Sequence, residues 1–213
     1  MHPDATARGA ASIPVAPEAL AQLYCRLHEK AIQPGCLFDP TWEIEPAAVI
    51  ARQVWSAEVL HFSSGKTVRV PFFSHFIERL ILLAPRDLQK LLCAAMLLSK
   101  GDRFRRCIDG GKIRSLDAVI GSSGLAAVRN LRTNLTTQPT VAAIDWSVGA
   151  LLGEAYAHID QVYRGQRKLV LDYLRIALPR DLPHVRSDCN EVGFERLVRQ
   201  AHEWYPEFKW LFG

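Results

Sequence analysis

The chain has 213 residues, of which 49% are hydrophobic and 23% are charged, and its formal net charge at pH 7 is +4. This balance is typical of a globular protein and excludes a wholly disordered or fibrous chain. The longest apolar run, over residues 91–98, is far shorter than the roughly 20 residues of a membrane-spanning helix, so the sequence predicts no membrane span.

The first part of the chain predicts a leader followed by helices. Residues 1–17 are rich in Ala and Pro, which predicts a disordered leader ahead of one domain over residues 18–213. Apolar residues recur at helical spacing over residues 18–32 and again over residues 46–60. Residues 66–73 alternate only weakly, and a lone strand would have no partner, so we interpret this segment as a loop.

Proline and glycine divide the middle of the chain into short helices. A helix over residues 73–83 is expected to end before Pro85, which then opens a helix with a wide apolar stripe. Gly101 is the predicted C-terminal cap of that helix, and Gly121 is the predicted end of a brief helix that follows Gly110 and Gly111. Ser122 or Ser123 is then expected to cap a longer helix that buries Leu125 and Val128. Residues 133–143 are the candidate boundary if the domain is subdivided.

The C-terminal part predicts a helical hairpin over residues 144–162 and 166–178, and a final helix over about residues 191–205. The tail over residues 208–212 is too apolar for a solvated end, so we expect it to fold back onto the core. Together these patterns predict an all-α fold. We expect an irregular multi-helix bundle of about eight to ten helices with little or no β structure.

Motifs for catalysis, cofactors and metals are missing from the sequence. The five cysteines never form Cys-x-x-Cys, and the seven histidines never form His-x-x-x-His. Residues 110–112 lack the glycine spacing and the following Ser or Thr of a phosphate-binding loop. Residues 121–124 fail the Gly-x-Ser-x-Gly spacing of a nucleophile elbow. The sequence therefore predicts a protein that is not an enzyme, with no cofactor and no metal site.

Positive charge is concentrated between Lys100 and Arg132, where eight basic residues accompany three acidic ones. Such clusters are most often solvated faces of a protein. The functional interpretation is a patch that docks an acidic protein surface, because a concentrated field of one sign steers association. The candidate protein-binding residues are Arg103, Arg105, Arg106, Lys112 and Arg114.

DNA binding is the alternative interpretation of the same region. Residues 116–131 read as helix, glycine turn and helix, and Arg129 and Arg132 would lie on the second helix. A helix-turn-helix needs a small residue four positions before the turn glycine, but Asp117 stands there. The patch also lacks the interleaved aromatic residues of single-strand binders. We therefore treat a helix-turn-helix-like regulator as the alternative and expect nucleic acid to be a poor partner.

One segment combines an apolar Leu-Leu-Cys run, a glycine and an Arg-Arg-Cys run, followed by a leucine-patterned helix pair over residues 116–128. The residues that carry the first three features are Leu91, Leu92, Cys93, Gly101, Arg105, Arg106 and Cys107. This order, over about 40 residues, resembles the middle of the SctK accessory proteins (YscK and PscK type) of bacterial type III secretion systems. Residues 38–40 are also similar to a short motif near the N-terminus of the members of that family. The length and the Ala- and Arg-rich composition favour its rhizobial nodulation branch.

The resemblance implies a cytosolic, mostly α-helical, non-enzymatic adaptor of the sorting platform beneath the secretion needle. Members of the family link the cytoplasmic domain of the inner-membrane ring protein to the pod protein, which connects to the ATPase complex. The implied role is effector export and, in rhizobia, host-specific nodulation. The implied location is the cytoplasm, with peripheral association at the inner membrane through the apparatus. The resemblance implies no small-molecule substrate, and it assigns no partner contact to a particular residue.

Overall fold

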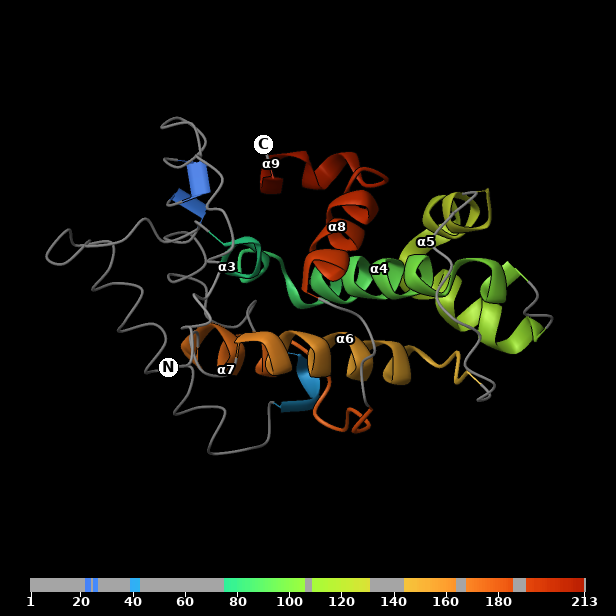
Figure 1. Cartoon of the computed structure of the whole chain (residues 1–213), viewed down its shortest axis with the longest axis horizontal. Coiled ribbons are helices and arrows are strands. Elements are labelled where there is room, and N and C mark those ends of the chain that lie inside the picture. The colour runs from blue at the N-terminus through green and yellow to red at the C-terminus, as the bar shows by residue number, and fades with distance from the viewer. Residues whose placement is uncertain are drawn as a thin grey trace, which may run out of the picture.

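The computed structural model describes residues 22–23, 25–26, 39–42, 75–105, 109–130, 144–163, 168–185 and 191–212 (Figure 1). Within these ranges the chain is all-α, as the sequence predicted, and no strand is present. The α-helices are α3 (Phe76–Leu80), α4 (Pro85–Arg105), α5 (Gly110–Asn130), α6 (Val148–Tyr163), α7 (Lys168–Ile176), α8 (Glu191–His202) and α9 (Lys209–Phe212). Two short 3-10 turns accompany them, η2 (Pro40–Trp42) and η3 (Pro206–Phe208).

The described residues hold seven α-helices, fewer than the eight to ten predicted for the whole chain. One reason is that most of the two helices expected over residues 18–32 and 46–60 lies outside the described residues. The other reason is that α4 and α5 each contain two helical pieces joined at a kink. The backbone is non-helical at Gly101 and at Gly121, so the breaks predicted at these glycines are confirmed, and each pair of pieces counts as one helix.

Helix α4 is the centre of the fold and contacts α5, α6 and α8. In Figure 1, α6 lies below α4, α8 lies above it, and α5 lies toward its C-terminal end. Every residue from 91 to 98 is buried, because neighbouring helices cover α4 on several sides. This is the environment that the wide apolar stripe predicted. A helix that is covered in this way is a rigid base for the surface residues at its C-terminal end.

Residues 39–42 join the N-terminal part of the chain to the helical core. The Asp39 N–H donates to the Ile176 carbonyl (3.0 Å), and Trp42 Nε1 donates to the Leu178 carbonyl (2.8 Å). The Asp39 carboxylate, which is buried, also accepts a hydrogen bond from Gln89 Nε2 (2.7 Å) on α4. Asp39, in the described part of the motif at residues 38–40, therefore connects the end of α7 to α4 through hydrogen bonds.

The aromatic C-terminal tail folds back onto the core, which confirms the sequence-based expectation. Phe208 and Leu211 are buried, and α9 packs against α3. Arg79 of α3 is itself buried and donates from Nη1 to the Leu211 carbonyl (3.3 Å). The tail therefore covers the apolar side of α3 and satisfies a polar group that would otherwise be costly to bury.

Gly153 of α6 lies where any side chain would press on the loop after α7. A Cβ atom at Gly153 would stand 2.5 Å from the Pro183 carbonyl oxygen, whereas one at Gly149 would meet Pro183 Cδ at an ordinary 3.8 Å. We expect Gly153→Ala to lower the free energy of unfolding by about 1–3 kcal/mol through overpacking. Gly149→Ala is the matched control, and it is expected to stabilise slightly because alanine favours helix by roughly 1 kcal/mol over glycine. Urea unfolding measures both variants, and changes of the same sign would contradict this packing.

His158 of α6 gives the fold a predictable pH dependence. Its side chain is buried against the Phe194 ring, with centroids 4.7 Å apart, and burial lowers its pKa below the ordinary value. Below about pH 6.5 the unfolded histidine takes up a proton that the folded one resists, so stability is complete above that pH and is lost as the pH falls. In urea titrations, the free energy of unfolding should fall less for the His158→Leu variant than for the native chain when the pH is lowered from 7.5 to 5.5. An identical loss in both proteins would contradict the assignment.

Several predictions concern residues that the structure does not describe. They are the leader over residues 1–17, the loop over residues 66–73, the boundary over residues 133–143, and Arg106, Cys107 and Arg132. The side chain of Arg105 also lies outside the described part.

Candidate protein-docking surface

Three of the five predicted patch residues have described side chains, and they lie on two consecutive helices. Arg103 lies on the last turn of α4, beyond the Gly101 kink, and is exposed. Arg114 is exposed and Lys112 is half-buried on the first turns of α5. Because α4 and α5 pack against each other, the sequence-predicted charges lie on one packed pair of helices.

Helix α5 begins with a side-chain cap that fixes the direction of its first turn. Asp109 Oδ1 accepts hydrogen bonds from the backbone N–H groups of Gly111 (2.9 Å) and Lys112 (3.1 Å). These N–H groups have no partner inside the helix, so the cap is expected to contribute about 1 kcal/mol. The cap therefore positions Lys112 and Arg114.

Two of the basic residues in this region interact with carboxylates of the same chain. Lys100 forms an ion pair with Glu154 of α6, with Nζ 2.7 Å from Oε2. The pKa of the Asp145 carboxyl is lowered, mainly by the hydrogen bond from the Ser147 N–H and further by the positive charge of Lys112. The charge of Lys100 is therefore largely neutralised by Glu154, and the charge of Lys112 is partly offset by Asp145.

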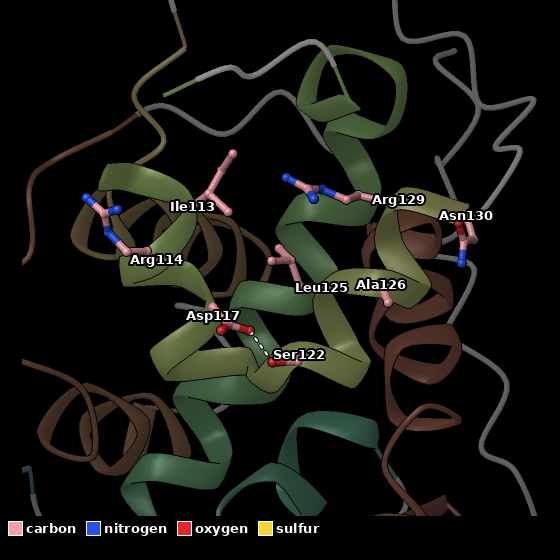
Figure 2. A pocket seen from close by; sticks show the side chains of 8 residues that line it. All are labelled: Ile113, Arg114, Asp117, Ser122, Leu125, Ala126, Arg129 and Asn130. Carbon is pink, nitrogen blue, oxygen red and sulfur yellow. Dashed lines mark hydrogen bonds between the residues drawn. The ribbon is translucent and has the colours of Figure 1, made fainter. Parts of the chain in front are cut away.

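The kink in α5 creates a groove that the sequence alone did not indicate. Gly121 adopts φ 74° and ψ 156°, a left-handed conformation that glycine takes without a steric penalty. The two halves of α5 then enclose an open hollow of about 390 Å³ (Figure 2). Its lining residues are Ile113, Arg114, Asp117, Ser122, Leu125, Ala126, Arg129 and Asn130.

The groove has an apolar interior and a positive rim. Figure 2 shows Leu125 between the two halves of α5, with Ile113 across from it and the Arg129 side chain extending toward Ile113. Arg114 and Arg129 are exposed, and neither forms an ion pair within the described part of the chain. Asp117 is the single acidic lining residue, and it accepts a hydrogen bond from the Ser122 hydroxyl (2.9 Å) at the kink.

Tyr205 holds the kink from beneath. Its hydroxyl donates to the carbonyl of Ile120 (3.1 Å), immediately before the glycine whose backbone leaves the helical path. A Cβ atom at Gly124, immediately after the kink, would lie 3.1 Å from Tyr205 Cζ, so the ring packs directly on the helix backbone. The ammonium group of Lys90 on α4 lies over the buried Tyr205 ring, with Nζ 4.2 Å from the ring centroid. Tyr205 therefore contacts the α5 backbone on both sides of the kink.

The sequence identifies Arg114 as a docking residue but does not group it with its neighbours in the groove. Arg129 belongs to the alternative, DNA-binding interpretation, and the helical pattern predicts Leu125 as a core position. Leu125 is buried as predicted, yet it also lines the groove. The position of Arg114 and Arg129 on either side of Gly121 is the only sequence signal that could have grouped them. It does not reveal the groove, because the direction of the chain after the glycine cannot be read from the spacing.

The described residues of the family-like motif contribute to packing. Leu91, Leu92 and Cys93 are fully buried in α4, and Gly101 is the kink in that helix. Burial raises the pKa of the Cys93 thiol to about 12, so this cysteine is a neutral core residue rather than a nucleophile. The side chains of Arg105, Arg106 and Cys107 lie outside the described residues.

Comparisons with known proteins return no match to a family model, a curated protein or a solved structure. In the described ranges, no three His, Cys, Asp or Glu side chains come together in a way that would hold a metal ion. None of the helices in those ranges is long and apolar enough to cross a membrane. The exposed surface of α4 and α5 is the candidate functional site among the described residues.

Proposed function

We propose that this chain is a non-catalytic adaptor of the cytosolic sorting platform of a bacterial type III secretion system. It links the inner-membrane ring protein to the pod protein and the ATPase complex and so supports effector export. The resemblance of the segment around Leu91 to Cys107 supports the choice of system. The observation that carries the docking role is the exposure of Arg103 and Arg114 on the packed helices α4 and α5.

The physical basis of the docking role is electrostatic steering by a rigid surface. The helices that carry these arginines are held in place, because the middle of α4 is buried and the first turn of α5 is capped by Asp109. Guanidinium groups bind carboxylates in a bidentate geometry and keep their charge at every physiological pH. An acidic partner surface therefore gains both association rate and orientation.

An adaptor also requires a second binding surface. A hollow of about 490 Å³ on α8 is the candidate for this second surface. It is lined by Glu195, Arg196, Arg199, Gln200 and Glu203. Arg199 and Glu195 pair with each other (2.8 Å), so this surface is polar and of mixed charge. Because the two surfaces differ in charge, they suit two different partners.

DNA binding is the second candidate, and one observation favours it. Arg129 is exposed on the helical half that follows the Gly121 kink, where a recognition helix would carry a basic residue. Asp117 lines the same groove and would repel a phosphate backbone. Duplex binding would fall steeply with salt concentration. A mobility-shift assay at low salt without a shifted band would remove this candidate.

Co-purification tests the adaptor role directly. The full chain, tagged and expressed in cells that produce the secretion apparatus, is expected to recover both the ring protein and the pod protein, as read by mass spectrometry. Cells that lack the ring protein are the control, and they should yield the pod protein alone. Recovery of neither protein by a folded chain would contradict the proposed function.

A further inference from the structure

We propose that the groove across the Gly121 kink is the docking contact itself, and that its occupant is a protein segment with an apolar side chain flanked by carboxylates. This inference rests on the proposed docking function. It adds Arg129 to the contact and assigns a chemistry to the partner segment.

The groove is a shallow, open hollow of about 390 Å³, which leaves room for a side chain. Ile113 and Leu125 supply apolar surface from opposite halves of α5 (Figure 2). An apolar side chain that enters between the halves loses contact with water on two sides, which is the main source of favourable free energy at such a site.

The charges of the groove fit carboxylates on either side of that apolar group. Arg114 lies on the first half of α5 and Arg129 on the second, and neither has an ion-pair partner among the residues described. The Asp117 carboxylate is engaged by Ser122 at the kink. Two guanidinium groups on opposite halves of α5, without an ion-pair partner among the described residues, therefore select a segment in which acidic residues flank an apolar one.

The same features disfavour a nucleic acid in this groove. A phosphodiester backbone has no apolar group to bury against Ile113 and Leu125. No aromatic ring is among the lining residues, so an unpaired base would have nothing to stack on. The interior of the groove therefore favours a protein segment over DNA or RNA.

Photo-crosslinking from inside the groove tests this inference. We would place p-benzoylphenylalanine at Ala126, an exposed lining residue, in the full chain within its native cells, and identify the crosslinked peptide by mass spectrometry. The same probe at Arg86, exposed on the first turn of α4 and outside both hollows, is the matched control. We expect the Ala126 probe to capture a segment with Asp or Glu on both sides of an apolar residue.

Two substitutions show whether the captured segment depends on the groove. Arg129→Glu should lower the crosslink yield from Ala126 at least about tenfold, since a favourable charge contact becomes a repulsion. Ile113→Gln should lower the same yield by removing apolar surface, while the yield from the Arg86 probe stays unchanged. If Arg129→Glu alters the circular dichroism of the chain, Arg129→Gln takes its place.

Crosslinks to nucleic acid, to a basic or uncharged segment, or to nothing would overturn the inference. A yield that is insensitive to Arg129→Glu in the folded chain would overturn it as well. An acidic, apolar-containing segment from a protein outside a secretion system would support the groove and overturn the adaptor role. Co-purification of the ring protein without a crosslink from Ala126 would support the adaptor role and overturn the groove.

Discussion

Replacing Arg103, Lys112 and Arg114 together by glutamate is expected to weaken binding of the acidic partner about 100-fold or more, which corresponds to about 3 kcal/mol. Arg103 and Arg114 are exposed on the packed helices α4 and α5, and Lys112 lies between them in sequence. Each substitution turns an attraction into a repulsion, and none removes a buried group. Titration calorimetry with the purified cytoplasmic domain of the ring protein measures the loss.

The matched control changes the net charge by the same amount at a different place. Arg86 on α4, Arg180 after α7 and Lys209 on α9 are exposed and lie outside both hollows, and their replacement by glutamate changes two arginines and one lysine, as in the test variant. We expect this control to alter the affinity by less than about threefold, because charges distant from a contact are largely screened by salt. Equal losses in both variants would mean that net charge alone governs binding. No loss in either would contradict the patch.

Phe208→Ala is expected to lower the free energy of unfolding by about 3–5 kcal/mol. The Phe208 side chain is only 2% exposed, and its ring lies 5.5 Å from that of Tyr205 between centroids. Its removal leaves a cavity beside the tyrosine that holds the kink of α5. Urea unfolding followed by circular dichroism measures the loss.

Phe212→Ala is the control for this prediction on the same tail. Phe212 is half-buried, and its ring contacts His202 and Arg199 at centroid distances of 4.8 and 4.9 Å. Because it keeps part of its surface in water, its truncation is expected to cost only about 1 kcal/mol. Similar losses for Phe208→Ala and Phe212→Ala would contradict the packing described for the tail.

Periodicity and helix-ending residues predicted much of the fold. The wide apolar stripe predicted the buried helix α4, and Pro85 begins that helix as expected. The hairpin predicted over residues 144–178 corresponds to α6 and α7, and the apolar tail lies on the core. These features depend on residues that are close in sequence or on the burial of apolar side chains, and both kinds of information are present in a single chain.

The groove could not be predicted in the same way, because it depends on contacts between distant residues. The sequence identified Gly121 as a helix stop, but the path after this glycine is fixed by Tyr205, which lies 85 positions after the Ile120 carbonyl that it binds. The convergence of Arg114, Leu125 and Arg129 follows from that path. Likewise, the pairing of Lys100 with Glu154 removes a charge that a count over the sequence had included.

The dependence of the association rate on salt tests electrostatic docking by this surface most directly. Steered association slows steeply as ionic strength rises, because salt screens the field that guides the encounter. Stopped-flow mixing of the chain with the ring protein's cytoplasmic domain is expected to show at least about a tenfold slower association in roughly 500 mM than in roughly 50 mM salt. The variant with glutamate at Arg103, Lys112 and Arg114 should associate slowly in both solutions. A native association rate that does not change with salt, or a variant that retains the native dependence, would contradict the account.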